Sequence, residues 1–237
     1  KPIDISLPPI KPFVIRMIIW NAKQLACNDM NNMNDLYISG IFNDEKICTD
    51  IHWRSSNRRG NFNYRLIWNI ELPIKKLYSK ITIQAWDQDI IGESDLIGEG
   101  FIDMYEIFKV AYDTLLPQRY NENQRDIWIE LFHSDHPNIS RGKVRISLEV
   151  VTKFYADQHP AGMGRDAPNI NPTLQEPIRP AFQLNRPLEL LADILGEEMY
   201  GKLKILSIVA CFCVPFFSVL WIWVQIKHAF GIKYSWE

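Results

Sequence analysis

Residues 143–150 read Lys-Val-Arg-Ile-Ser-Leu-Glu-Val, a strict alternation of polar and apolar side chains. Because successive side chains of a β-strand point to opposite faces, this pattern predicts a strand with one buried and one exposed face. Further short runs rich in β-branched and aromatic residues precede it, separated by turn-forming clusters. The predicted strands are Phe13–Asn21, Asp35–Phe42, Lys46–Trp53, Arg65–Glu71, Lys80–Trp86, Leu96–Asp103, Asp126–Phe132 and Lys143–Thr152.

These strands all lie in residues 1–155, so we predict an all-β domain there, an eight-stranded antiparallel β-sandwich. The chain has 237 residues, of which 47% are hydrophobic and 23% charged, enough for one such domain plus additional segments. A short helix is expected between two strands, over Tyr105–Leu116. Its apolar residues recur at helical spacing, at Ile107, Phe108, Ala111 and Leu115.

The segment 156–187 is rich in proline. Proline lacks a backbone donor and disrupts helices, so this segment is predicted to be extended. It is either a linker or a strap that lies across the domain. The prolines are Pro160, Pro168, Pro172, Pro177, Pro180 and Pro187.

The C-terminal region predicts two helical segments and a short tail at residues 228–237. Residues 188–203 carry apolar residues at the spacing of an amphipathic juxtamembrane helix. Residues 205–226 contain no charged side chain, and a helix of that length spans about 33 Å, enough to cross a hydrocarbon core of about 30 Å. We therefore predict a transmembrane helix at 204–227. A buried helix of a soluble domain is the alternative, which the basic flanks disfavour.

Basic residues flank this helix unequally. Arg186, Lys202 and Lys204 precede it, whereas Lys227 and Lys233 follow it. The positive-inside rule thus favours a cytosolic location for the β domain in a single-pass membrane protein.

The four cysteines are not spaced like a disulfide framework, which agrees with a reducing compartment. Cys211 and Cys213 lie in the apolar run, either as apolar filler or as acylation sites. The chain begins with Lys1 and has no signal-peptide pattern, so we expect a fragment of a longer protein.

Aspartates gather in two polar loops at strand ends. Asp29 and Asp35 bracket the loop after the first strand, and Asp87 and Asp89 end a later strand, with Asp95 beginning the next. Calcium takes six to eight oxygen ligands, more than one loop usually supplies. If the two loops converge, they predict a Ca²⁺ site. Ordinary turn chemistry is the alternative, because aspartate favours turns.

The tips of these loops are apolar, with Met30 and Met33 in the first and Ile90 and Ile91 in the second. We predict that these four side chains insert into a membrane, since burial of each one would gain about 1.5–3 kcal/mol. The alternative is that they pack beneath their own loops.

A basic surface is a second candidate for membrane contact. Anionic headgroups attract such residues by about 1 kcal/mol each. A solvated sheet face explains them equally well. The residues are Arg54, Arg58, Arg59, Arg65, Lys75, Lys76 and Lys80.

Enzymatic motifs are missing from the sequence. It has no glycine-rich phosphate loop, nucleophile elbow or helical pair of metal-binding histidines. His133 and His136 are interpreted as part of a surface turn, and Asn138 is a glycosylation acceptor only if the domain is extracellular. Because these motifs are missing, we expect no catalysis and no small-molecule substrate. The net charge of −2 gives no indication of a nucleic-acid partner, so none is expected.

The two aspartate loops resemble the calcium loops of C2 domains, with all five carboxylate positions filled. Other stretches resemble, more narrowly, the C-terminal end of a ferlin, and the single helix beyond them completes the order of parts. The ferlin-like stretches are Pro9–Trp20, Thr49–Ser55, Gly60–Arg65, Gly162–Pro168 and Leu174–Pro180.

This resemblance implies a C2-type sandwich in a tail-anchored protein that carries other C2 domains. It also implies calcium-dependent binding to anionic phospholipid membranes, in vesicle fusion, exocytosis or membrane repair. The alternative function is a calcium-independent structural module that docks partner proteins or sister C2 domains at a membrane.

Overall fold

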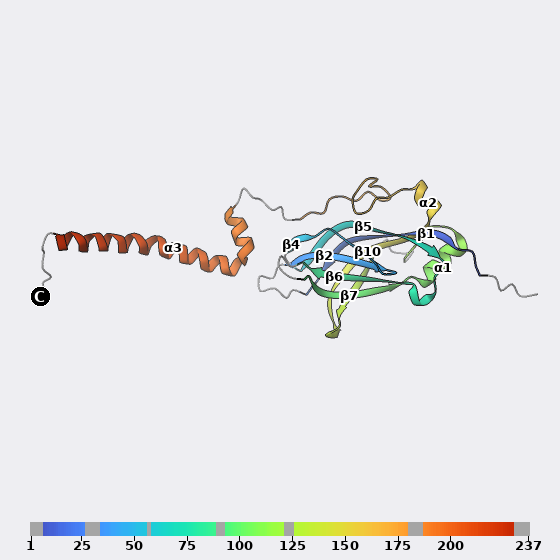
Figure 1. Ribbon diagram of the computed structural model, residues 1–237, viewed down its shortest axis with the longest axis horizontal. Coiled ribbons are helices and arrows are strands. Elements are labelled where there is room, and N and C mark those ends of the chain that lie inside the picture. The colour runs from blue at the N-terminus through green and yellow to red at the C-terminus, as the bar shows by residue number, and fades with distance from the viewer. Residues whose placement is uncertain are drawn as a thin grey trace, which may run out of the picture. The chain divides into compact units, whose positions relative to one another are not determined.

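The computed structural model describes residues 7–26, 34–55, 58–88, 93–120, 126–179 and 187–229. The chain divides into two compact units, residues 1–180 and 181–237. The first unit is a β-sandwich with two short helices and one 3₁₀ turn (Figure 1). Its strands are β1 (Lys11–Lys23), β2 (Asn34–Phe42), β3 (Glu45–Cys48), β4 (His52–Ser55), β5 (Arg59–Leu72), β6 (Lys80–Asp87), β7 (Asp95–Asp103), β8 (Gln118–Arg119), β9 (Ile127–His133) and β10 (His136–Thr152).

All pairings in this sandwich are antiparallel, in the order β3-β2-β6-β7-β9-β10-β1-β5. The short strands β4 and β8 lie off this path, beside β2 and β10. The predicted eight-stranded sandwich is confirmed, because the path has eight strands. The alternation that predicted β10 is also confirmed, since Val144, Ile146, Leu148 and Val150 are all buried.

One predicted strand, Lys46–Trp53, is divided into β3 and β4. The break follows from Thr49, whose hydroxyl accepts a hydrogen bond from the Ile38 amide at 3.0 Å and donates to the Asp50 carbonyl at 2.9 Å. A side chain thus takes the place of a regular ladder contact at this point.

The core fills the space between the two layers of the sandwich. Trp68 is fully buried there, together with Ile15 from β1 and Ile38 from β2. The predicted helix is confirmed as α1 (Tyr105–Thr114), which buries Phe108 and Ala111. It ends at Leu115, whose φ of 59° is the left-handed conformation that stops a helix.

The proline-rich segment lies against the sandwich. After the short helix α2 (Lys153–Gln158), residues 159–179, here called the strap, run across β5. Gly164 pairs with Arg65 as an isolated bridge, and Leu174 is only 3% exposed. Residues 159–179 are therefore a docked strap and not a free linker, and they belong to the first compact unit.

The second unit contains one continuous helix, α3 (Pro187–Ala229), with Pro215 inside it. The predicted juxtamembrane and transmembrane segments are thus parts of a single helix. Its stretch Gly201–Lys227 has a mean hydropathy of 2.5 and is the one segment of the described chain long and apolar enough to cross a membrane. Those 27 residues measure about 40 Å as a helix.

Candidate functional site

Strand register brings both predicted aspartate loops to one edge of the sandwich. Asp87 at the end of β6 lies opposite Asp95 at the start of β7. On the other side of β6, Asp87 lies opposite Leu36 of β2, the neighbour of Asp35. We call Asp35, Asp87 and Asp95 the aspartate rim.

Backbone hydrogen bonds hold two of these aspartates together. The Asp35 amide donates to Oδ1 of Asp87 at 2.7 Å, and the Gln88 amide donates to the Asp35 carbonyl at 2.7 Å. Oδ1 of Asp35 in turn accepts the Arg54 amide at 2.6 Å. These bonds orient both carboxylates, so their remaining oxygens have defined directions.

The base of the first loop is also tied to this edge. Nδ2 of Asn34 donates to the Ala26 carbonyl at 3.1 Å, which joins the two ends of the loop. Nε of Arg58 donates to the Leu25 carbonyl at 2.5 Å. The Ala26 amide donates to the Arg141 carbonyl of β10 at 2.8 Å. Loop 27–33 and loop 88–94 therefore begin and end at the same edge.

The remaining predicted rim residues lie outside the described residues. These are Asp29 and Asp89 among the ligands, and Met30, Met33, Ile90 and Ile91 among the membrane-inserting side chains. Within the described ranges, no group of three His, Cys, Asp or Glu side chains is close enough to hold a metal ion. A complete calcium site thus requires Asp29 or Asp89 in addition to the aspartate rim.

The chemistry of the aspartate rim nevertheless suits calcium. Its donors are carboxylate oxygens, which hard divalent cations prefer. Among the described residues, no lysine or arginine side chain forms an ion pair with Asp35 or Asp95. Their negative charge is therefore not balanced by a cationic side chain of the described chain.

The prediction that the basic residues form one exposed surface is wrong in two respects. Arg65 is 0% exposed, because its guanidinium donates to the strap carbonyls of Gly162, at 3.0 Å, and Pro172. It cannot reach a headgroup. The other members are also divided: Arg58 and Arg59 lie where β5 begins, whereas Lys75 and Lys76 follow its far end.

The division of this surface follows from the length of β5. Its 14 residues separate the two basic groups by about 45 Å. Arg58 and Arg59 are exposed near the aspartate rim, and Arg54 is half-buried there. Only these three of the predicted basic residues lie at the edge that carries the aspartates.

An ion-pair cluster of Asp50, Arg165 and Arg179, here called the strap cluster, holds the strap and was missed by the sequence analysis. Asp50, between β3 and β4, pairs with Arg165 at 2.7 Å and with Arg179 at 2.9 Å. Burial would raise the pKa of the Asp50 carboxyl, but hydrogen bonds and charge from both arginines together lower it below its ordinary value. Arginine within the otherwise proline-rich strap is the signal that indicates such pairing.

His52 lies beside this cluster and is only 4% exposed. Its Nδ1 accepts the Asn61 amide at 3.0 Å, so the ring is held as an acceptor. Burial, and next the positive charge of Arg179, lower the pKa of His52 to about 4. This histidine is neutral at neutral pH and serves the packing of β4.

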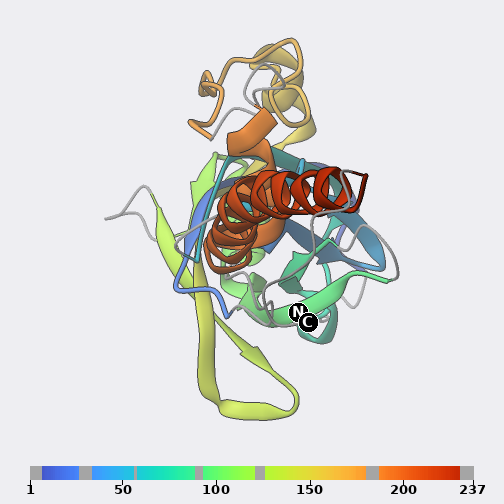
Figure 2. The same cartoon turned by 90° about the vertical axis from the view of Figure 1, so that its left-hand side faces the viewer.

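His133 and His136 face each other across the two-residue turn of the β9–β10 hairpin. The hairpin projects beyond the sandwich (Figure 2). Asp135, 3.5 Å from the His133 ring, lies in the turn itself. The interpretation of these histidines as a surface turn is confirmed.

Known proteins resemble this chain in sequence and in fold. The C2-domain family matches residues 14–124. Myoferlin of Xenopus tropicalis is 27% identical over 274 residues, covering 95% of this chain, and Ferlin 2 of Tetrahymena thermophila is 26% identical, covering 74%. The chain spans only 14% and 10% of these relatives' length. A solved C2 domain of plant extended synaptotagmin 1 superposes with a TM-score of 0.43 at 11% identity, covering 59% of this chain and 94% of that one.

Proposed function

Because this chain carries a C2 domain of the ferlin family, we propose that it binds calcium at the aspartate rim and thereby attaches to membranes of anionic phospholipid. The observation that carries this proposal is the register that sets Asp87 opposite Asp95 and beside Asp35. Asp29 and Asp89 complete the ligand set from the adjoining loops. The proposal contains no catalytic step.

The aspartate rim would act as an electrostatic switch. Without a cation, its carboxylates repel an anionic bilayer. Bound calcium supplies compensating positive charge and open coordination positions for phosphate oxygens of lipid. Met30, Met33, Ile90 and Ile91 then enter the membrane interface, while Arg58 and Arg59, exposed nearby, add attraction to headgroups.

The helix α3 would anchor the chain in its own membrane. Its stretch Gly201–Lys227 has the length and hydropathy for one span. We propose that the C2 domain faces the cytosol from a vesicle or plasma membrane, next to sister C2 domains of a longer chain. Because the tether holds the domain near lipid, its effective concentration at a membrane is high. A role in vesicle fusion or membrane repair follows from this arrangement.

One observation favours the calcium-independent alternative. Asp35 and Asp87 each already accept a backbone amide of the protein itself. Such bonds stabilise a carboxylate without any metal. In that case the domain would serve as a docking module for partner proteins or sister C2 domains.

A vesicle-binding experiment separates the two functions. The full chain, held in nanodiscs of phosphatidylcholine, is mixed with phosphatidylserine-containing vesicles, and binding is followed with calcium and with EDTA. We expect binding only with calcium, and loss of it in the double variant Asp87→Asn with Asp89→Asn. An amide at position 87 keeps the acceptor for the Asp35 amide, so the fold should survive.

The matched control is Asp113→Asn, which removes an exposed charge from α1. It should bind vesicles as the wild type does. Calcium-dependent binding that survives the double variant would refute the assignment of the aspartate rim. Binding of equal strength in EDTA would support the docking module instead.

A further inference from the structure

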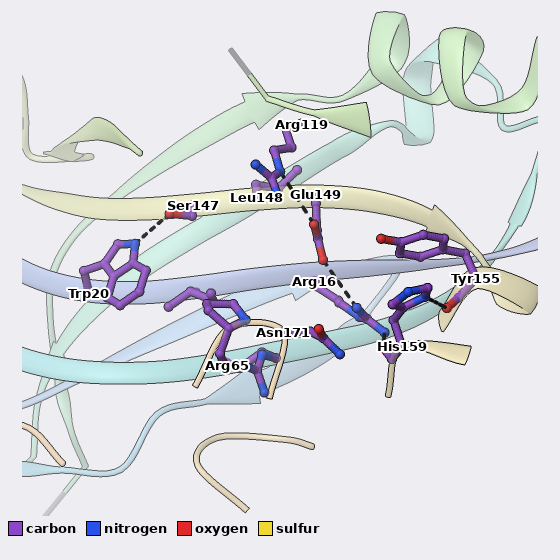
Figure 3. A pocket seen from close by; sticks show the side chains of 12 residues that line it. Arg16, Trp20, Arg65, Arg119, Ser147, Leu148, Glu149, Tyr155, His159 and Asn171 are labelled. Carbon is purple, nitrogen blue, oxygen red and sulfur yellow. Dashed lines mark hydrogen bonds and ion pairs between the residues drawn. The ribbon is translucent and has the colours of Figure 1, made fainter. Parts of the chain in front are cut away.

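A cavity of about 480 Å³ lies between the outer face of the sandwich and the segment that covers it. Strands β1, β5 and β10 form its floor, and α2 with the strap forms its opposite wall (Figure 3). We call it the strap cavity. It is separate from the aspartate rim, because none of its lining residues belongs to the aspartates or to the loops that carry them.

Three arginines, Arg16, Arg65 and Arg119, line the strap cavity, and its only acidic lining residue, Glu149, pairs with two of them. Glu149 on β10 lies 3.4 Å from the guanidinium of Arg16 and 3.8 Å from that of Arg119. Arg16 is 4% exposed and Arg65 is 0% exposed. Three positive charges and one negative charge leave a surplus of two positive charges around the cavity.

Backbone carbonyls accept many of the hydrogen bonds that the two buried arginines, Arg16 and Arg65, donate. Because these carbonyls are neutral, they do not compensate the positive charge of the arginines. Arg16 donates to the carbonyls of Ala156, at 3.3 Å, and His159, at 2.5 Å. Arg65 donates to Gly162 and Pro172, and its Nε has no hydrogen-bond partner among the described residues. Buried charge is costly unless it is paired with an opposite charge.

The two buried guanidiniums also oppose each other. Burial, and after it the charge of Arg16, lower the pKa of Arg65 below its ordinary value. An added anion would offset both effects. Figure 3 shows Arg119 and Glu149 on one side of the cavity and His159, stacked on Tyr155 at 4.2 Å, on the other. Arg119 remains 68% exposed, so its donors are accessible to a ligand.

We propose that the strap cavity binds a phosphate group, carried by a lipid headgroup or by a soluble phosphate ester, and does so without calcium. A phosphate monoester carries about two negative charges near neutral pH, which matches the surplus. Guanidinium is the side-chain group that best matches phosphate oxygens. Arg119 and Arg16 would contact the phosphate, and Arg65 would act through its charge from beneath.

Phosphate titration tests this proposal. Inorganic phosphate is added to the full chain in phosphatidylcholine nanodiscs, in EDTA, and binding is followed by phosphorus NMR. We expect saturable binding, weakened about tenfold by Arg119→Gln, the loss of one charge-assisted contact. Because Arg119 is exposed, this variant should fold normally. Lys109→Gln, an equal charge change on α1, is the control and should bind as the wild type does.

Vesicles that contain phosphatidylinositol phosphate distinguish the two sources. If the vesicles bind in EDTA and Arg119→Gln weakens this binding, the ligand is a lipid headgroup. If inorganic phosphate binds but Arg119→Gln leaves vesicle binding unchanged, the ligand is a soluble ester. Absence of saturable phosphate binding, or equal weakening by Lys109→Gln, would overturn the proposal. EDTA keeps this outcome distinct from that of the calcium site.

Discussion

Asp50 and Asp95 are both aspartates at the edges of strands, yet their surroundings differ. Asp50 pairs with Arg165 and Arg179 of the strap, so the chain itself balances its charge. Asp95 is exposed and forms no ion pair with any described residue. An aspartate with internal partners stabilises the fold, whereas one without them is available to an external cation.

This contrast also separates two modes of attachment. At the strap, arginine and aspartate join parts of one chain that are more than a hundred residues apart in sequence. At the aspartate rim, backbone amides position the carboxylates of Asp35 and Asp87, and Asp35 and Asp95 form no ion pair with a described lysine or arginine. Acid or mutation at the Asp50–Arg165–Arg179 cluster should therefore lower the stability of the fold. The aspartate rim should instead respond to calcium.

The largest expected effect is a loss of folding stability in acid, caused by the protonation of His52. Its pKa is about 4 in the fold and 6.5 ordinarily, so the unfolded chain takes up the proton first. The contribution of neutral His52 to the free energy of unfolding is therefore fully present above pH 6.5. It falls by about 3 kcal/mol as the pH approaches 4. Urea unfolding at several pH values measures this loss.

The control for this effect is His52→Asn. An asparagine oxygen can accept the Asn61 amide but does not titrate in this range. The variant should lose less stability than the wild type between those pH values. An identical pH slope in both proteins would contradict the role given to His52.

Neutralising Asp50 should have the next largest effect. Asp50→Asn leaves Arg179 without its carboxylate partner and Arg165 with only the exposed Glu176, and should cost about 2 kcal/mol in free energy of unfolding. The same change at the rim, Asp95→Asn, should shift stability by less than about 0.5 kcal/mol in EDTA, because that side chain is exposed. Denaturant unfolding of both variants at neutral pH compares them directly.

Acid should abolish the difference in stability between the wild type and Asp50→Asn. Because the Asp50 pKa in the fold lies below its ordinary value of 3.8, its contribution is complete above that pH and is lost as the pH falls further. Wild type and Asp50→Asn should therefore converge as the pH falls below 3.8. A gap that stays constant into that range would show that charge is not what Asp50 contributes.

The smallest expected effect belongs to a surface ion pair on α2. Lys153 and Asp157 lie 3.0 Å apart at positions four residues apart, and both are about half exposed. Lys153→Gln should cost about 0.3–0.5 kcal/mol, and the loss should vanish in high salt. Thermal unfolding at low and high salt measures it. If Lys153→Gln cost as much stability as Asp50→Asn, solvent exposure would not explain why one ion pair contributes more to stability than the other.

Much of the fold could be predicted from sequence, because it depends on local periodicity. The alternation at 143–150 and the apolar residues of 105–116 each follow from the geometry of a single strand or helix. The break at Thr49 could not be predicted in this way, because it depends on a hydrogen bond to Ile38 of the neighbouring strand. Periodicity does not report such contacts.

The candidate site divides along the same line. Its five aspartates are predicted from their spacing, but the approach of Asp35, Asp87 and Asp95 to one another depends on β6 lying between β2 and β7. The basic residues were assigned to one surface by proximity in sequence, and β5 instead separates them along its length. A charged residue inside an apolar strand, such as Arg16 or Arg65, indicates a buried partner without identifying it.

Side-chain type and local spacing were therefore enough to identify the strands, the apolar helix and the acidic loops, since each depends on neighbours in the chain. Burial of Arg65, pairing of Asp50 with Arg165 and Arg179, and the strap cavity required the folded chain. The physical reason is that electrostatic and hydrogen-bond energies depend on distance in space, and these partners are remote in sequence.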